Sequence, residues 1–234
     1  RENVTVKEVE NIPYAYEISD YDYIAGLKSF QDGMYQIQDI SSMLAGEYTA
    51  PKAGDTIVDV CGAPGGKSIN AALKMLEQGD CGRVIARDLS DYKVALIDEN
   101  IKRLNITNIQ TQVYDALDCD ESLINKADIV IADLPCSGLG IIGRKPDIKY
   151  NASPEKLQSL VDLQRDILKV VSRYVKSGGV LMYSTCTINR AENEDNADWI
   201  CKESGFTKDG EYHQLLPANN SGMDGFFVAR LIKS

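Results

Sequence analysis

The strongest constraint on the fold is an alternation of short apolar segments with longer amphipathic ones, which begins near residue 56. The apolar segments have the length of buried strands, and the amphipathic ones repeat apolar residues at helical spacing. Strands that alternate with helices predict a mostly parallel sheet with helices on both faces. The expected strands are Thr56–Val60, Arg83–Ala86, Ile109–Tyr114, Asp128–Ala132 and Val180–Ser184, and the expected helices are Lys67–Glu77, Asp91–Leu104 and Pro154–Val175.

The two ends of the chain depart from this alternation. Residues 1–50 predict a small N-terminal α+β segment, and residues 51–234 predict one α/β domain. The last two strands are close in sequence, so we expect them to pair antiparallel. The elements expected at the two ends are a strand at Tyr14–Ile18, a helix at Asp39–Glu47, a charged helix at Arg190–Glu203, and strands at Phe206–Leu216 and Phe226–Leu231.

Composition and charge exclude several classes of protein. The net charge of −10 argues against nucleic-acid binding over the whole surface, but it allows a local basic groove. No segment approaches the roughly 20 apolar residues that span a bilayer, and the polar start is not a signal peptide. The six cysteines form no C-x-x-C pair and His213 is the only histidine, which disfavours a zinc site. We therefore expect reduced thiols, a cytoplasmic protein and no bound metal.

A glycine-rich loop, Asp59-Val60-Cys61-Gly62-Ala63-Pro64-Gly65-Gly66-Lys67-Ser68, follows the first expected strand. Such a loop binds ligands through backbone N–H groups and the start of the next helix. An acidic residue about 20 positions later can bind a ribose, and Asp88 stands there. A phosphate-binding P-loop would need glycine in place of Cys61, so its spacing fails by one residue. An ordinary strand-to-helix turn without a ligand remains the alternative.

Two cysteines also stand at the ends of expected strands. Cys136 lies in Asp133-Leu134-Pro135-Cys136-Ser137-Gly138, and Cys186 lies in Tyr183-Ser184-Thr185-Cys186-Thr187. Ligands of parallel sheets bind beyond the carboxyl ends of the strands, so both thiols and the glycine loop should meet at one edge. His213 lies in an unrelated C-terminal stretch, which disfavours a Cys–His hydrolase. The remaining cysteines, Cys61, Cys81, Cys119 and Cys201, are interpreted as packing or loop residues.

The glycine loop and the two cysteine motifs together resemble the S-adenosylmethionine-dependent RNA 5-methylcytosine methyltransferases of the NOL1/NOP2/Sun group, and bacterial enzymes that act on 16S rRNA most of all. The likeness runs from about residue 30 to the end and includes Phe30–Asp39, Arg144–Tyr150 and Asp224–Leu231. Gly62 and Ser68 stand where the family often has Ala and Thr, and no departure removes a reactive group. Similar bacterial enzymes also carry an N-terminal RNA-binding helical domain, so we do not expect these residues alone to bind rRNA.

The resemblance implies a Rossmann-like methyltransferase fold with a seven-stranded sheet, and methyl transfer to C5 of a cytosine in RNA. By the same resemblance, Cys186 is the nucleophile that adds to cytosine C6, Cys136 assists product release and Asp133 binds the cytosine ring. It implies S-adenosylmethionine as cofactor, bound by Cys61, Gly62, Ala63, Pro64, Gly65, Gly66, Lys67, Asp88, Asp115 and Asp133.

The cationic residues Arg144, Lys145 and Lys149 suit phosphate contacts beside the cleft, although a solvated surface loop would look the same. We expect RNA as the partner, with 16S rRNA as substrate, and a monomer that binds neither membrane nor metal. Two alternatives stay open. In a DNA cytosine-5 methyltransferase the Pro-Cys cysteine, here Cys136, would be the nucleophile. A ribosome-assembly module would bind S-adenosylmethionine without turnover.

Overall fold

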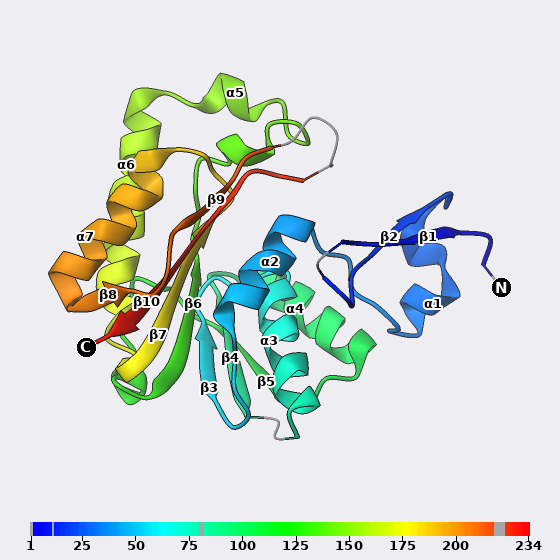
Figure 1. Cartoon of the computed structure of the whole chain (residues 1–234), viewed down its shortest axis with the longest axis horizontal. Helices are drawn as coiled ribbons and strands as arrows, with labels where there is room; N and C mark the ends of the chain where they lie inside the picture. Colours follow the sequence, from blue (N-terminus) through cyan, green and yellow to red (C-terminus); the bar gives the residue numbers. More distant parts are fainter. Residues whose placement is uncertain (1, 11, 80–81, 218–222) are drawn as a thin grey trace.

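The computed structural model describes residues 2–10, 12–79, 82–217 and 223–234, so Cys81 lies outside the described residues. Its main sheet has eight strands in the order β5-β4-β3-β6-β7-β10-β8, with β9 paired to β10 (Figure 1). The strands are β3 (Thr56–Asp59), β4 (Arg83–Asp88), β5 (Ile109–Val113), β6 (Ala127–Asp133), β7 (Val175–Thr185), β8 (Phe206–Lys208), β9 (His213–Leu215) and β10 (Phe226–Lys233). Strands β3 to β7 run parallel, and β10 is antiparallel to its three neighbours, which confirms the mostly parallel α/β prediction.

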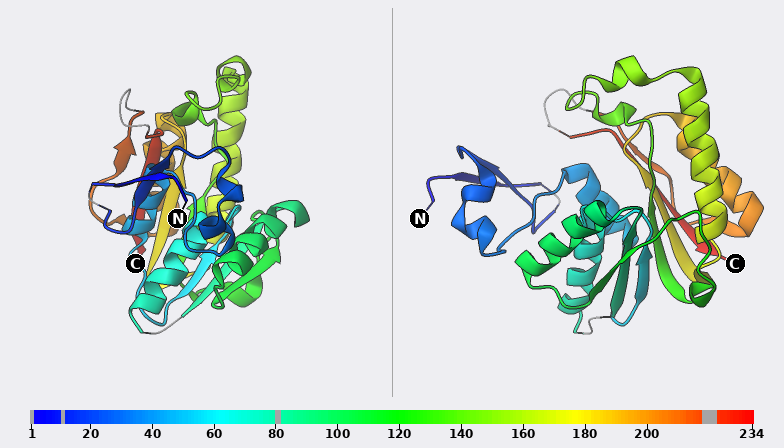
Figure 2. Two further views of the ribbon diagram at one scale, coloured as in Figure 1. Left: turned by 90° about the vertical axis from the view of Figure 1, so that its right-hand side faces the viewer. Right: turned by 180° about the vertical axis from the view of Figure 1, so that it is seen from behind.

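Helices cover both faces of this sheet (Figures 1 and 2). They are α2 (Ile40–Thr49), α3 (Gly66–Glu77), α4 (Asp91–Leu104), α5 (Ile148–Asn151), α6 (Pro154–Val171) and α7 (Glu194–Ser204). Apolar side chains of α6 and α7 pack on one face, and those of α2, α3 and α4 pack on the other. Neighbouring residues of each central strand contribute to opposite cores, as in β6, where Val130 joins the first and Ile131 the second. This two-sided burial explains why these strands read as continuous apolar runs.

The predicted boundary between α6 and β7 was wrong. We expected Ser177-Gly178-Gly179 to end a helix that reached Val175, but α6 ends at Val171 and β7 already begins at Val175. Val175 pairs with Ala127 and Val180 with Ile129, so the extra residues between them form a bulge within the strand. Gly178 has φ +73°, a backbone conformation that favours glycine, which accounts for the sequence at this bulge.

The C-terminal elements also differ from the prediction. The expected strand Phe206–Leu216 is split into β8 and β9, and this division gives eight strands where we expected seven. Gly210, at φ +78°, lies in the turn between the two pieces. The expected helix at Arg190–Glu203 is a single 3₁₀ turn, Arg190–Glu192, followed by α7. The break falls at Asn193, whose side chain is bonded to Thr185 and Thr187.

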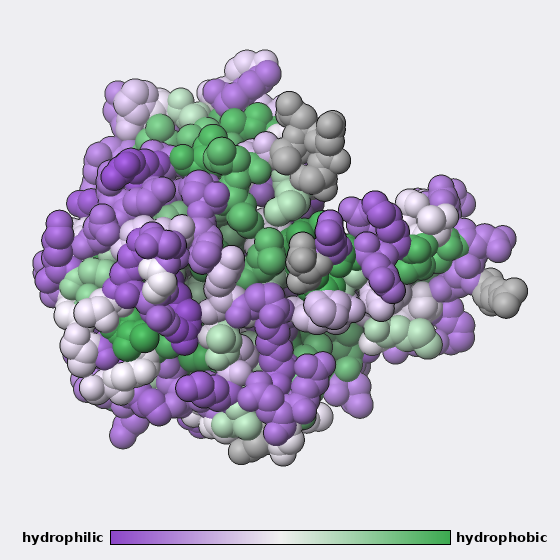
Figure 3. Space-filling model, in the orientation of Figure 1, coloured by the Kyte–Doolittle hydropathy of each residue, from purple (hydrophilic) through white to green (hydrophobic). Residues whose placement is uncertain are grey.

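Residues before α2 form a small lobe that projects from the body (Figures 1 and 2). It contains β1 (Thr5–Glu8), β2 (Tyr16–Ser19) and the short α1 (Lys28–Gln31), and β1 pairs antiparallel with β2. Figure 3 shows exposed hydrophobic atoms on this lobe. The lobe has the α+β character expected of residues 1–50, while the division into two domains stays a prediction. Within the described ranges no helix combines the length and apolarity that crossing a membrane requires.

Candidate active site

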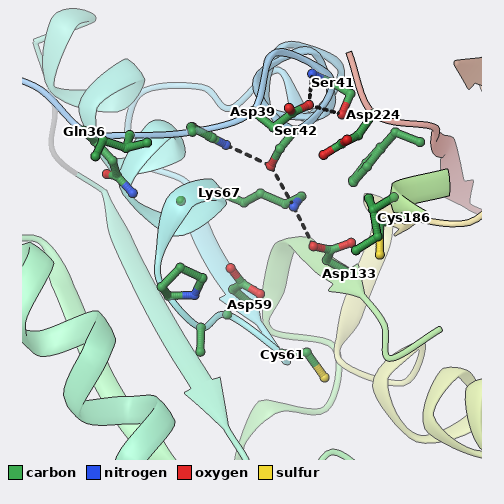
Figure 4. Close-up of a pocket in the computed structure, with 18 residues that line it drawn as sticks. Gln36, Asp39, Ser41, Ser42, Asp59, Cys61, Lys67, Asp133, Cys186 and Asp224 are labelled. Atoms are coloured by element: carbon green, nitrogen blue, oxygen red, sulfur yellow. Dashed lines mark hydrogen bonds and ion pairs between the residues drawn. The ribbon is translucent and has the colours of Figure 1, made fainter. Parts of the chain in front are cut away.

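A pocket of about 310 Å³ lies at the carboxyl edge of the sheet (Figure 4). Its walls come from the glycine loop, the ends of β6 and β7, the segment that leads into α2, and residues 224–226. Two of the lining residues, Asp39 and Asp224, are ion-paired to Arg144. The three motifs predicted to meet at one sheet edge are therefore in contact with one another in the folded chain.

The glycine loop is compact and leaves little room for side chains. Gly65 adopts φ +106°, and its N–H donates to the Gly62 carbonyl oxygen at 2.6 Å. A Cβ on Gly62 would lie 3.2 Å from the Asp59 carboxylate, and one on Gly66 would lie 3.3 Å from the Gln38 amide. A Cβ at position 62 or 66 would therefore crowd the side chains of Asp59 and Gln38, which line the pocket.

Asp59 ends β3 beneath this loop and is 1% exposed. Its Oδ2 accepts a hydrogen bond from Ser68 Oγ at 2.7 Å, whereas Oδ1 has no partner among the described residues. Burial raises the pKa of Asp59 to about 6, because the charged carboxylate is poorly solvated there. Sequence reasoning did not select Asp59 as a site residue, although it is the acidic last residue of the strand before the loop.

Lys67 lies in the first turn of α3 and reaches across the pocket (Figure 4). Its Nζ is 2.5 Å from Asp133 Oδ2 and 3.1 Å from Ser42 Oγ, and it lies 5.1 Å from the centre of the Phe226 ring. Asp133 Oδ1 accepts a second hydrogen bond from Ser184 Oγ at 2.9 Å. The pair fixes the Asp133 carboxylate between β6 and β7 and places a positive charge at the centre of the pocket.

The two strand-end thiols lie in contact. Cys136 Sγ and Cys186 Sγ are 3.2 Å apart, although the residues are 50 positions apart in sequence. The hydrogen bond from Cys136 and the positive charge of Lys67 lower the pKa of Cys186. The same hydrogen bond, together with burial, raises the pKa of Cys136. Cys186 lines the pocket, whereas Cys136 opens onto a neighbouring apolar pocket bounded by α5 and α6, so the thiol with the lowered pKa is the one that faces the pocket.

Some predicted cofactor residues lie outside the pocket walls. Asp88 is buried under the glycine loop, where its carboxylate accepts from the Ala63 N–H at 3.0 Å and pairs with Lys93 at 3.0 Å. The Asp115 carboxylate accepts from the Leu117 N–H at 2.9 Å. Burial raises the pKa of Cys61, which lines the pocket and keeps a protonated thiol. In this structure Asp88 therefore orders the loop itself.

The three cationic residues of the predicted RNA-binding loop have different surroundings. Arg144 pairs with Asp39 and, at 3.1 Å, with Asp224, so it joins the pocket wall to the loop after β6. Lys145 and Lys149 are exposed, and Lys149 Nζ lies 4.8 Å from the centre of the Tyr150 ring. Among the described residues neither lysine forms an ion pair with a carboxylate, whereas Arg144 is paired with two.

Comparison with known proteins gives consistent matches. A sequence model described as 16S rRNA methyltransferase RsmB/F matches residues 47–232. A probable ribosomal RNA small subunit methyltransferase B from Bacillus subtilis (strain 168) is 38% identical over 229 residues, which cover 90% of this chain and 50% of that protein. The chain spans about half the length of the curated relatives it matches.

Two solved structures share the fold. The crystal structure of PH0851 has a TM-score of 0.90 and 30% sequence identity, covering 98% of this chain and 54% of that one. The crystal structure of NSun6 from Pyrococcus horikoshii with SFG has a TM-score of 0.80 and 28% identity, covering 94% of this chain and 59% of that one.

Proposed function

The chain belongs to the 16S rRNA methyltransferase RsmB/F family, and we propose that it transfers a methyl group from S-adenosylmethionine to C5 of a cytosine in RNA. Membership confirms the family and the Rossmann-like fold expected from the sequence. Cytosine as the base, 16S rRNA as the substrate and Cys186 as the nucleophile belong to the proposal. One observation carries it: two thiols in contact at the pocket, with their pKa values shifted in opposite directions.

The residues of the pocket fit S-adenosylmethionine. Gly62 and Gly66 line the pocket, and the absence of a Cβ at both positions leaves room for a nucleoside-containing ligand to approach the loop. Asp59 Oδ1 is a buried acceptor with no partner in the described part of the chain, and the ammonium group of the methionine part could donate a hydrogen bond to it. We assign the cofactor to Cys61–Lys67, with Asp88, Asp115 and Asp133 at the neighbouring strand ends. When bound, it supplies the methyl group as a sulfonium.

The first step assigned to the protein is addition of the Cys186 thiolate to C6 of the cytosine. C5 is a poor nucleophile in free cytosine, and the new sulfur–C6 bond turns C5 into an enamine carbon that can take the methyl group. Lys67 and the Cys136 S–H stabilise the thiolate before attack. The base must leave its stack to reach the Cys186 thiol, which lines the pocket.

Asp133 is assigned to binding of the cytosine ring, and Cys136 is assigned to release of the product. The Asp133 carboxylate is held by Lys67 and Ser184, and it can bind the ring and favour its protonated, electrophilic form. After methylation the C5 proton passes to water, the C5–C6 double bond re-forms and the sulfur–C6 bond breaks. The Cys136 S–H, 3.2 Å from Cys186 Sγ, can protonate the departing thiolate. Its release role therefore follows from the same contact that lowers the pKa of Cys186.

Substituting each thiol with serine tests the assignment. Cys136→Ser should accumulate a covalent RNA adduct that survives denaturing electrophoresis, because release is slowed after attack. Cys186→Ser should give no adduct and no methyl transfer. The opposite pattern, with an adduct only in Cys186→Ser, would make Cys136 the nucleophile and favour the DNA cytosine-5 alternative.

A second assay separates the enzyme from a non-catalytic module. Transfer of tritium from labelled S-adenosylmethionine should be measured with 16S rRNA, with cytosine-containing DNA and without nucleic acid. Because the chain spans half of its relatives, the assay needs both this chain and a full-length protein of the family. Cofactor binding without transfer to any substrate would favour the binding module. RNA binding by Arg144, Lys145 and Lys149, the monomeric state and the cytoplasmic location stay predictions.

A further inference from the structure

Glu192 is a buried carboxylate that the proposed reaction does not use. It is 0% exposed and lies in the 3₁₀ turn after Cys186. Its described side-chain partners are neutral donors: the Ser137 N–H, the Gln164 side-chain amide and the Asn189 side-chain amide. Burying a carboxylate costs free energy unless its oxygens are well bonded, so this arrangement calls for a structural reason.

On one side the carboxylate holds the loop that carries Cys136. Glu192 Oε2 accepts from the Ser137 N–H at 2.9 Å, directly after the thiol. Gln164 Nε2 donates to the Pro135 carbonyl at 2.9 Å, directly before the thiol, and to Glu192 Oε2 at 3.0 Å. The peptide groups on both sides of Cys136 are therefore fixed through the same carboxylate oxygen.

On the other side the carboxylate holds the loop that carries Cys186. Glu192 Oε1 accepts from Asn189 Nδ2 at 2.9 Å, and the Asn189 N–H donates to Thr187 Oγ1 at 3.2 Å. Thr187 Oγ1 in turn lies 2.7 Å from Ser137 Oγ, which closes the connection between the two loops. The residues next to each thiol thus meet at Glu192, from segments about 50 positions apart.

We infer that Glu192 is a positioning residue whose two carboxylate oxygens hold the Cys136 and Cys186 loops in register, so that the thiols stay in contact. A carboxylate is required because both oxygens accept hydrogen bonds. A glutamine would have to turn its NH₂ group toward one of the donors, leaving that bridge broken. The role in catalysis rests on the proposed function, whereas the geometric role does not.

Oxidative crosslinking measures the thiol contact without cofactor or RNA. Diamide takes one hydrogen from each of two thiols onto its N=N bond, and the two sulfurs join in a disulfide. The rate of Cys136–Cys186 disulfide formation, followed by peptide mass spectrometry, therefore reports how often the thiols meet. We expect Glu192→Gln to slow crosslinking about tenfold, as loss of one hydrogen bond to a charged group predicts. Glu203→Gln, an exposed change of the same chemistry on α7, should leave the rate unchanged.

Further readouts separate positioning from simple destabilisation. The pH midpoint for alkylation of Cys186 by iodoacetamide should rise in Glu192→Gln, because the Cys136 donor is displaced. At a temperature where circular dichroism shows both proteins folded, an unchanged crosslinking rate and alkylation midpoint would overturn the inference, even if the melting temperature falls. Should Glu192→Gln fail to fold, Asn189→Ala, which removes one donor to Oε1, gives the same readouts, and unchanged values there would overturn it as well.

Methyl transfer then separates this inference from the proposed function. In an active protein, Glu192→Gln should lower kcat while KM for S-adenosylmethionine stays the same, since the variant leaves the glycine loop intact. If the wild-type protein transfers no methyl group but the crosslinking difference is found, the proposed function fails and the positioning role stands. If methyl transfer is found and crosslinking is insensitive to Glu192, the positioning role fails alone.

Discussion

Asp59→Asn should make the free energy of unfolding less dependent on pH. The pKa of Asp59 rises from 3.8 to about 6 in the folded protein because the carboxylate is buried, and none of the described residues bonds to Oδ1. Between these two values the folded state binds a proton that the unfolded state has released, so stability falls as pH rises. A shift of this size corresponds to ~3 kcal/mol of lost stability once the pH is above the folded pKa. Asparagine does not titrate and removes this loss.

Urea unfolding of the wild type and the variant at several pH values between 4 and 7.5 gives the required comparison. Other carboxylates titrate in both proteins, so their contributions cancel when the unfolding free energy of the wild type is subtracted from that of Asp59→Asn. This difference in unfolding free energy should move by ~3 kcal/mol in favour of the variant as pH rises. Asp118→Asn, at an exposed position, serves as a control and should shift the difference far less. A difference that does not change with pH would refute the reasoning that the Asp59 carboxylate is charged and poorly compensated.

Three more substitutions test the packing and the charge around the thiols. Lys67→Met removes the positive charge that lowers the pKa of Cys186, so alkylation of that thiol at pH 7 should slow ~10-fold, which peptide mass spectrometry would detect. In Gly140→Ala the new Cβ would lie 2.3 Å from the Gly225 carbonyl oxygen and 2.8 Å from the Cys186 carbonyl oxygen. It should cost about 3 kcal/mol in urea unfolding, whereas Gly143→Ala, with open space, should cost little. Leu168→Ala, at a fully buried position, should lower the unfolding free energy by ~2–5 kcal/mol, against a small change for Leu73→Ala at a 43% exposed position.

The central α/β pattern could be predicted because each of its elements is buried on both faces or carries one apolar stripe. The helix Asp91–Leu104 was predicted to its last residue, since Ser90 caps it and Asn105 ends it in a left-handed conformation. Strand β1 was missed because its four residues, Thr5–Glu8, are all exposed and pair only with β2. The Gly178 bulge was read as a helix stop because a glycine pair has the same sequence signature in both settings.

The location of the candidate site could be predicted, because ligands of parallel sheets bind at the carboxyl ends of the strands. The contacts between its side chains could not be predicted in this way. Parallel topology brings the ends of β3, β6 and β7 to one edge, so the convergence of the loop and thiols was predictable. The Lys67–Asp133 pair joins residues 66 positions apart and depends on side-chain rotamers, for which the sequence carries no periodic signal. The ribose contact of Asp88 stays a prediction, whereas its hydrogen bond from the Ala63 N–H depends on tertiary distances for which the sequence carries no signal.

The unequal surroundings of the two thiols suggest how one pair could serve both attack and release. At 3.2 Å the two sulfurs share one hydrogen bond, so removing the first proton leaves a single negative charge on the pair. The hydrogen bond between the sulfurs lowers the pKa of Cys186 and raises that of Cys136; burial and Asp133 disfavour the charge on both thiols, and Lys67 favours it on Cys186. The remaining charge is therefore favoured on Cys186 and the remaining proton on Cys136. Attack consumes the charge, and the retained proton lies beside the sulfur that must later leave. The distance between the Cys136 and Cys186 sulfurs therefore matters both for attack on the base and for release of the product. Because Glu192 holds the two loops that set this distance, it can affect turnover without touching the substrate.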